Sequence, residues 1–371
     1  YFHEKFPIKK LNVYQLYCIF FHSSTFVSSI TVKYFTMTAE LVGISLEVTI
    51  IFFIISLAVV IFSADKFIDF SSILAGRLGV SEFIIGLTLI AFGTSIPEIF
   101  VGVQSLQNQA ENLAVSAIIG SNISNIALIF GIACIGRSMM PKKNATRLRL
   151  YIPLILSVIF LGYALADLKI DVLDSLLILI VLPIFIYCIY TDRLIGVSDA
   201  NENTSDSFEK SSMSNLMLSS GLVLMTLLLF YAAEGVVITG LDIASRLNIS
   251  STFVGLVLIA IGTSVPELAA TVAAIVKKKT DLVVGNVIGS NILNIVLVIP
   301  IIGFFSTNDA FLDKDLISRD MLVVSIATLL FAVFIFLQNK HPFKNLKVIK
   351  FGGFMFVLGY FVYILFLANV F

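Results

Sequence analysis

The segments GLTLIAFGTSIPE (residues 86–98) and GLVLIAIGTSVPE (residues 255–267) are two copies of one pattern, 169 positions apart. A second pair, IGSNISNI (119–126) and IGSNILNI (288–295), follows at the same offset. Aligned without gaps across both pairs, the copies are identical at 20 of 41 positions. Apolar composition would repeat Leu, Ile and Val rather than Gly-Thr-Ser and Pro-Glu, so the identity indicates an internal duplication.

The copies lie in an unusually apolar chain. Of its 371 residues, 58% are hydrophobic and 13% are charged, against about 25% charged in ordinary soluble domains. Mean hydropathy is +1.02. So few charges cannot cover that much apolar surface in water, so lipid must surround most of the chain. This composition excludes a soluble enzyme and a disordered protein, and the zero net charge gives no field that would attract nucleic acid.

Cysteine and histidine offer no further chemistry. The three cysteines lie in separate apolar runs without a CxxC pair, and the three histidines are scattered toward the two ends. A zinc or iron centre needs such residues in a cluster. We therefore expect no enzyme, no resident cofactor and no obligate protein partner, only the lipid bilayer and small ions.

Ten apolar segments predict ten membrane-spanning helices, and hence an all-α integral membrane protein, because backbone groups in lipid must bond within their own helix. The segments are 41–62, 83–107, 112–136, 150–167, 171–191, 215–236, 252–276, 281–304, 320–338 and 349–370. The polar stretch 192–214 separates five helices in 37–191 from five in 215–371.

Residues 1–36 stand apart from this arrangement. Met37 directly precedes the first clear span, whereas segment 11–32 is apolar but mixed with Ser and Thr. That segment fits a signal-like leader, an extra span or translated upstream sequence. We expect the functional unit to start near Met37.

Lys and Arg are sorted between alternate loops. With the amino end of the first helix outside, the inside loops hold 16 of these residues and the outside loops hold 4. The positive-inside rule therefore predicts a multi-pass protein of the inner or plasma membrane, with the 192–214 loop in the cytoplasm.

Each copy of the repeat contains five predicted spans. Because five is odd, the second copy enters the membrane from the opposite side, and the two five-helix repeats are inverted. This architecture is typical of secondary transporters, which bind their substrates near the bilayer midplane between the repeats.

One carboxylate in each repeat lies midway along a predicted span. Glu98 and Glu267 occupy equivalent positions of the two copies. An ionisable residue at such a depth costs at least about 2.5 kcal/mol. We therefore interpret the pair as functional rather than as protonated structural residues.

The neighbours of each glutamate add oxygen atoms. Pro97 has no N–H, so the carbonyl of Gly93 loses its helical partner, and we expect the helix to kink or unwind there. Gly262 and Pro266 repeat this arrangement. A Thr-Ser pair lies one turn before each carboxylate, on the same side of the helix: Thr94 with Ser95, and Thr263 with Ser264.

The next helix of each copy contributes hydroxyl and amide groups. Ser121 and Asn125 lie four residues apart on one face, as do Ser290 and Asn294. Together with the glutamates, these side chains form an all-oxygen set of the kind that hard cations prefer. Two carboxylates can offset one Ca²⁺ or two Na⁺ but not both, because the excess charge would be costly at low dielectric. Such mutual exclusion is what an antiporter needs.

Other residues of these helices receive weaker assignments. Gly120 and Gly289 are candidates for exposed backbone carbonyls, although close helix packing also explains them. Asn122 and Asn291 lie off the ligand face, and we expect them to bridge helices. Asp65, expected near the end of the first helix, is assigned a helix-end or loop contact.

The motif pairs GTSIPE…GSNISN and GTSVPE…GSNILN resemble the two alpha repeats of the cation/calcium exchanger superfamily, and within it the prokaryotic sodium/calcium exchangers and their potassium-dependent relatives. The resemblance covers essentially all of 37–371. It implies exchange of Na⁺ for Ca²⁺ by alternating access, with helices 1 and 6 sliding against the other eight. It also implies two central carboxylates, further side-chain ligands and four backbone carbonyls: Glu98, Glu267, Thr94, Ser95, Thr263, Ser264, Ser121 and Ser290, with Ala91, Ala260, Gly120 and Gly289.

Two features depart from the family pattern. Where several relatives have Asp at the last motif position of one repeat, this chain has Asn125 and Asn294, so the site has one anionic group fewer. Asn286 in the second repeat is matched by Ala117 in the first, so one amide is absent there.

These departures leave ion stoichiometry and the coupling ion open. A Ca²⁺/H⁺ or K⁺-coupled antiporter of the same fold remains the alternative. A cation channel is disfavoured, because channels usually build their pores by oligomeric symmetry or re-entrant filters.

Overall fold

The computed structural model describes residues 45–107, 111–136, 148–191, 213–246, 264–305, 312–340 and 346–367, and every regular element within these ranges is helical. The expected leader 1–36 and nearly all of the 192–214 loop lie outside the described residues. The predicted all-helical class is therefore confirmed for the part of the chain that is described.

The helices of the first half are α3 (Leu46–Leu78), α4 (Glu82–Ile85), η3 (Gly86–Ile90), α5 (Ala91–Thr94), α6 (Ile96–Gln107), α7 (Glu111–Ile123), η4 (Ser124–Phe130), α8 (Gly131–Gly136), η6 (Leu148–Leu150), α9 (Tyr151–Ala164) and α10 (Val172–Leu179). Those of the second half are α12 (Asn215–Arg246), α14 (Val265–Val276), α15 (Thr280–Leu293), η7 (Asn294–Val298), α16 (Ile299–Phe305), η8 (Leu316–Met321), α17 (Leu322–Lys340) and α18 (Leu346–Leu367).

Eight stretches of the described chain are long and apolar enough to cross a membrane. Two shorter apolar helices, Tyr151–Ala164 and Val265–Val276, lie where the fourth and seventh spans were expected. Large apolar side chains such as Ile54, Ile61 and Leu173 are exposed on the outer helices, as lipid contact requires.

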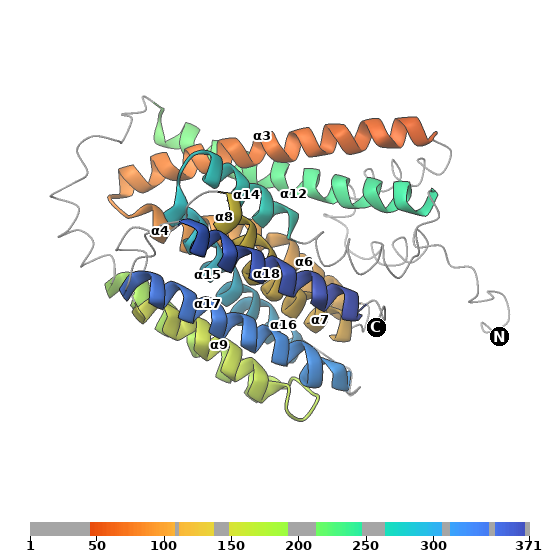
Figure 1. Ribbon diagram of the computed structural model, residues 1–371, viewed down its shortest axis with the longest axis vertical. Helices are drawn as coiled ribbons and strands as arrows, with labels where there is room; N and C mark the ends of the chain where they lie inside the picture. Colours follow the sequence, from red (N-terminus) through yellow and green to blue (C-terminus); the bar gives the residue numbers. More distant parts are fainter. Residues whose placement is uncertain are drawn as a thin grey trace.

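The helices form a bundle around a buried centre (Figure 1). α3 and α12 lie side by side along one edge, and α9 and α17 lie at the opposite edge. Between them, the segments Ala114–Gly136 and Thr280–Phe305 are the most deeply buried stretches. These two central segments carry the second motif of each repeat, so the fold places both motifs away from lipid.

α3 and α12 are antiparallel. Near the end of α3, Arg77 donates to the side chain of Asn215 at 2.7 Å and to the carbonyl of Met213. At the other end, the Thr49 hydroxyl donates to Asp242 at 3.0 Å. The two helices are longer than the expected spans 41–62 and 215–236, because both continue through charged residues to Leu78 and Arg246.

The loops of the bundle gather at two ends. The turns that follow α3 and α14 meet at one end, where the ammonium of Lys279 pairs with Glu82. At the other end, the N–H of Leu312 donates to the carbonyl of Leu168 at 2.7 Å, and the N–H of Asp313 donates to Asn112 at 2.8 Å. The predicted topology placed each of these groups of loops on one side of the membrane.

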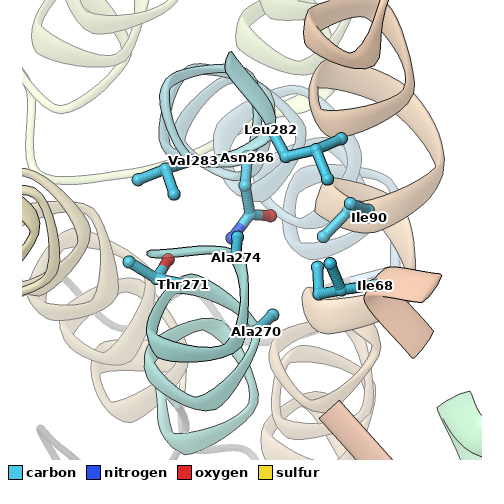
Figure 2. Close-up of a pocket in the computed structure, with 8 residues that line it drawn as sticks. All are labelled: Ile68, Ile90, Ala270, Thr271, Ala274, Leu282, Val283 and Asn286. Carbon is cyan, nitrogen blue, oxygen red and sulfur yellow. The ribbon is translucent and has the colours of Figure 1, made fainter. Parts of the chain in front are cut away.

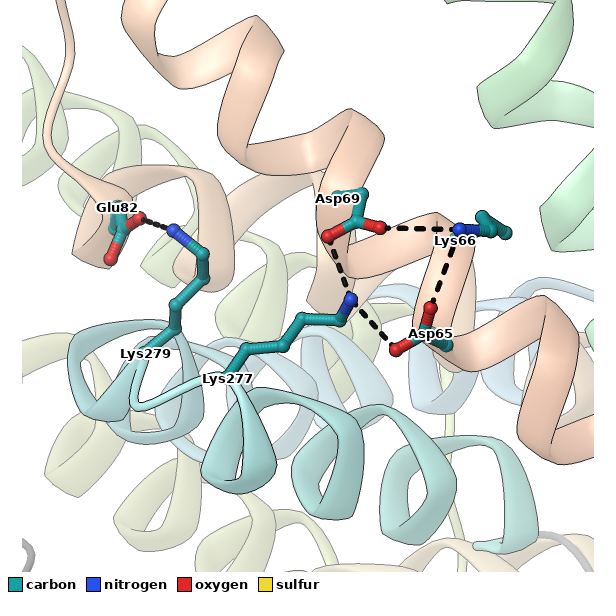
Figure 3. Close-up of polar contacts among 6 residues, drawn as sticks. All are labelled: Asp65, Lys66, Asp69, Glu82, Lys277 and Lys279. Carbon is teal, nitrogen blue, oxygen red and sulfur yellow. Dashed lines mark hydrogen bonds and ion pairs between the residues drawn. The ribbon is translucent and has the colours of Figure 1, made fainter. Parts of the chain in front are cut away.

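A cluster of charged side chains joins α3 to the turn after α14 (Figure 3). The ammonium of Lys277 lies 2.7 Å from both Asp65 and Asp69. Burial lowers the pKa of Lys277, but its hydrogen bonds to the two carboxylates outweigh this effect and raise the pKa above its ordinary value. Asp65 thus makes a loop contact, as expected, but it lies inside α3 rather than near the end of the helix.

Candidate cation-binding site

Glu98 follows a break in its helix, and Glu267 lies in the first turn of α14. α5 ends at Thr94, Ser95 has φ −84° and ψ 4°, and α6 begins at Ile96. At the equivalent position, Ser264 has φ −92° and ψ 8° directly before α14. The kink expected near Pro97 is confirmed, because proline cannot donate the hydrogen bond that would continue the preceding turn.

Glu98 is buried in the bundle, with 2% of its surface exposed. The Ser121 hydroxyl donates to its Oε1 at 3.1 Å, whereas Oε2 has no hydrogen-bond partner among the described residues. A buried charged oxygen without a partner is costly. This atom is therefore available to a cation.

Glu267 is equally buried, with 1% of its surface exposed. Neither of its oxygens has a hydrogen-bond partner in the described part of the chain, and the Thr94 hydroxyl lies close by without meeting hydrogen-bond geometry. The carboxyl groups of Glu98 and Glu267 are close enough to interact electrostatically. The structure thus brings together two acidic residues that are 169 positions apart in the chain.

Four other candidate ligands contribute buried oxygens that have no hydrogen-bond partner within the described ranges. They are the hydroxyls of Ser95 and Ser264 and the amide oxygens of Asn125 and Asn294. Each unpaired group costs about 1–3 kcal/mol, and a hard cation would satisfy several of them at once. Where the chain is described, no three His, Cys, Asp or Glu residues gather, so the donor set does not resemble a transition-metal centre.

Thr94 and Ser290 meet where α5 packs against α15. Their hydroxyl oxygens are 3.5 Å apart. Both hydroxyls are within hydrogen-bond distance of Asn286 Oδ1, at 3.3 Å from Thr94 and 3.4 Å from Ser290. Asn286 was not among the predicted ligands, and its difference from Ala117 was the one sequence signal that pointed to it.

Asn122 bridges the two central segments. Its Nδ2 donates to the carbonyl of Asn291 at 3.1 Å, and its Oδ1 accepts from Asn294 Nδ2 at 3.2 Å. This contact confirms the bridging role expected of Asn122. Because Asn122 and Asn291 are equivalent positions, a residue here contacts its own counterpart.

Each central segment changes to a π-helix close to its amide ligand. η4 begins at Ser124, directly before Asn125, and η7 begins at Asn294. π-helical turns shift the hydrogen-bond ladder by one residue and frequently occur at functional sites. In both halves the π-helical turn lies at the second motif, which supports a functional role for this part of the bundle.

The backbone candidates are placed unevenly. The Ala91 carbonyl accepts from the N–H of Ser95 at 3.0 Å. Gly289 is in close contact with η3, because a Cβ there would lie 2.2 Å from the Leu87 carbonyl oxygen. Gly120 is partly buried. Two of the predicted site residues lie outside the described residues: Ala260, a backbone candidate, and Thr263, a side-chain candidate.

Comparison with known proteins agrees with this arrangement. The sodium/calcium exchanger protein family matches residues 48–191 and 218–369. The inner membrane protein YrbG of Escherichia coli is 31% identical over 309 residues, covering 81% of this chain and 93% of that protein. The sodium/calcium exchanger MaX1 of Methanosarcina acetivorans is 28% identical, covering 77% and 91% of the two chains.

A solved structure of the sodium–calcium exchanger NCX_Mj, soaked with Na⁺ and Sr²⁺, has a similar fold. The TM-score is 0.70 at 26% sequence identity, covering 86% of this chain and 98% of that chain. With its apolar helices, these similarities make the chain a multi-pass membrane protein with an exchanger fold.

Proposed function

Because the chain belongs to the sodium/calcium exchanger protein family, we propose that it is a secondary active antiporter that exchanges Na⁺ for Ca²⁺ across the membrane. One observation carries the proposal. Glu98 and Glu267 are buried together in the apolar bundle, and three of their four carboxylate oxygens have no hydrogen-bond partner among the described residues. Such a pair is stable when a cation balances its charge.

The charge of this site accounts for exchange. Two carboxylates balance one Ca²⁺ or two Na⁺. Holding both kinds of ion together would leave excess positive charge in a medium of low dielectric, where Coulomb repulsion is strong. Binding of one ion therefore excludes the other, and the Na⁺ gradient can drive Ca²⁺ out.

The proposed ligands are the two carboxylates together with side-chain and backbone oxygens of both repeats. The side chains are Thr94, Ser95, Ser121 and Asn125 from the first repeat, and Thr263, Ser264, Ser290 and Asn294 from the second. Backbone carbonyls of Ala91, Ala260, Gly120 and Gly289 complete the set. All of these groups offer an oxygen atom as ligand, which suits Na⁺ and Ca²⁺.

The proposed architecture is ten spans in two inverted five-helix repeats, with the ions bound between them. The antiparallel pairing of α3 with α12, and the contact of Asn122 with its own counterpart, support this arrangement. In alternating access, α3 and α12 would move as a pair against the rest of the bundle, at whose edge they lie (Figure 1). We expect the end of the bundle near Met213 to face the cytoplasm, because the positive-inside rule favours that side for the loops rich in Lys and Arg.

The test is counter-flux in proteoliposomes of the purified chain. Uptake of radioactive Ca²⁺ is measured with a Na⁺, a K⁺ or a pH gradient imposed one at a time, each with an ionophore that clamps the membrane potential. We expect saturable Ca²⁺ uptake driven by the outward Na⁺ gradient alone.

Two outcomes would overturn the proposal. Uptake that follows the pH or K⁺ gradient would make the chain a Ca²⁺/H⁺ or K⁺-coupled antiporter. Uptake that needs no counter-ion and does not saturate would indicate a channel.

A further inference from the structure

Asn286 joins two proposed ligands that come from different repeats. It lies on α15 one turn before Ser290, and 2% of its surface is exposed. Its Oδ1 accepts from Ser290 at 3.4 Å and from Thr94 at 3.3 Å. The equivalent residue of the first repeat is Ala117, which has no polar side-chain atom. This arrangement therefore exists in one half of the site and not in the other.

The position of the hydroxyl hydrogens decides whether Ser and Thr can bind a cation. Each hydroxyl has one hydrogen and two lone pairs, and the hydrogen must point away from the ion. The Ser290 hydrogen is directed to Asn286 Oδ1. The Thr94 hydroxyl has three acceptors within reach: the Ile90 carbonyl at 3.0 Å, Asn286 Oδ1 at 3.3 Å and the Ala91 carbonyl at 3.4 Å. Both oxygens are left with lone pairs for a cation.

In the first repeat, the serine hydroxyl hydrogen is accepted by the carboxylate itself. There, with Ala117 in place of an amide, the Ser121 hydroxyl donates to Glu98 Oε1 at 3.1 Å. In the second repeat Asn286 takes the corresponding hydrogen, and both oxygens of Glu267 stay without a hydrogen-bond partner among the described residues. Glu267 is therefore free of the serine hydrogen bond that Glu98 accepts.

The other end of the amide points away from these ligands. Asn286 lines a narrow crevice between α3, η3, α14 and α15 that has no room for a water molecule, together with mainly apolar side chains (Figure 2). In this view the amide oxygen faces Ile90 and the nitrogen faces Ala274. Asn286 Nδ2 has no hydrogen-bond partner in the described chain. Its N–H groups, which would repel a cation, are thus turned away from the Thr94 side.

We propose that Asn286 is a positioning residue that turns the hydroxyl hydrogens of Thr94 and Ser290 away from the ion and leaves Glu267 as the stronger carboxylate ligand. This inference rests on the cation site of the proposed function. The two halves of the site are then unequal, although their motifs are nearly identical.

The test measures cation binding separately from transport. Ca²⁺ affinity is obtained from the Ca²⁺-dependent rise of the unfolding temperature in detergent, and the Ca²⁺ concentration for half-maximal uptake is obtained in proteoliposomes. Asn286→Leu keeps the size of the side chain and removes the acceptor. We expect about tenfold weaker Ca²⁺ binding, which corresponds to about 1.4 kcal/mol, and a larger effect on half-maximal concentration than on maximal rate.

Two further variants separate positioning from packing. Asn286→Asp keeps an acceptor oxygen at the same place and adds a negative charge near the cation, so it should bind Ca²⁺ at least as tightly as the original chain. Thr271→Val changes another residue that lines the same crevice (Figure 2) and should leave Ca²⁺ affinity unaltered.

The results distinguish the inference from the proposed function. Unchanged Ca²⁺ affinity in Asn286→Leu, or an equal loss in Asn286→Asp and Thr271→Val, would overturn the role of Asn286. Failure of Na⁺ to drive Ca²⁺ uptake in the original chain would overturn the proposed function, while the binding measurements would still decide the role of Asn286.

Discussion

The two halves of the candidate site have nearly the same sequence but different hydrogen bonds. Around Glu98, the Ser121 hydroxyl donates to the carboxylate. Around Glu267, the corresponding serine, Ser290, donates to Asn286 instead. One substitution outside the shared motifs, Asn286 against Ala117, accounts for the difference.

The comparison teaches that a duplicated motif need not give two equivalent ligands. The motif fixes which oxygen atoms are present, because it specifies the residue types. Which of them remain free for an ion depends on donors and acceptors that arrive from elsewhere in the fold.

The largest expected effect comes from neutralising either carboxylate. Glu98→Gln or Glu267→Gln removes one of two charges that face the cation, which at an effective dielectric near 20 is worth about 4 kcal/mol at contact distance. We expect Na⁺-dependent Ca²⁺ uptake to fall at least about a hundredfold in both, with Glu267→Gln losing more Ca²⁺ affinity. Uptake in proteoliposomes and thermal stabilisation by Ca²⁺ measure the two quantities.

Gel filtration of both variants in detergent is the control for folding. Full uptake by either variant would remove that residue from the site. A greater loss of affinity in Glu98→Gln would reverse the proposed ranking of the two halves.

The next effect concerns how tightly each central helix is packed. A Cβ at Gly285 would lie 2.3 Å from the carbonyl oxygen of Phe83, whereas the equivalent residue of the first repeat, Ser116, is exposed. Gly285→Ser should therefore force α15 away from α4 and destabilise the protein by about 1–3 kcal/mol. The reciprocal change Ser116→Gly should cost about 0.5 kcal/mol, through helix propensity alone.

Thermal unfolding in detergent, followed by loss of the monodisperse gel-filtration peak, compares these two variants. Gly359→Ala serves as a further control, because a Cβ there meets nothing within 4 Å among the described residues. Equal stability of Gly285→Ser and Ser116→Gly would show that the two central helices are packed alike.

An effect of similar size is expected from the hydrogen bond that Ser121 makes to Glu98. Ser121→Ala removes a neutral donor to a charged acceptor, together with one proposed ligand oxygen, and such bonds contribute about 1.5–3 kcal/mol. We expect the Ca²⁺ concentration for half-maximal uptake to rise about tenfold or more, with the folded protein retained. An unchanged half-maximal concentration would mean that Ser121 neither binds the ion nor orients Glu98.

The smallest effect is expected at the charged cluster that joins the halves near α3. Lys277→Met removes ion pairs to Asp65 and Asp69, whose side chains are 40% and 37% exposed. Solvent screening limits the loss of stability to about 1 kcal/mol or less. Lys278→Met is the matched control, because Lys278 is exposed and makes no ion pair within the described residues. If both variants lower the unfolding temperature equally, the ion pairs of Lys277 do not contribute to stability.

Local chemistry made several features of this fold predictable. The break at Ser95 follows from Gly93 and Pro97, because the missing N–H acts within one turn of its own helix. The bridging of Asn122 follows from its place off the helix face that carries Ser121 and Asn125. Most span positions follow from apolar run length.

Other features depended on contacts that the sequence does not display. The apolar run of the first span ends near Phe62, yet α3 continues to Leu78. Its charged residues are tolerated because Lys277, more than 200 positions away, pairs with Asp65 and Asp69 (Figure 3). Propensity and hydropathy cannot anticipate a partner at that distance along the chain.

By itself, the sequence determined that the chain lies in lipid, that it contains an internal duplication and that each copy carries one mid-span glutamate. Each of these is a property of residue types and their spacing. Only the tertiary structure decided which oxygens are free. Thr94 and Asn286 are separated by 192 residues, and their contact exists only when α5 packs against α15. A hydrogen bond depends on the distance between two atoms in space, so the asymmetry of the site could not be read from its two matching motifs.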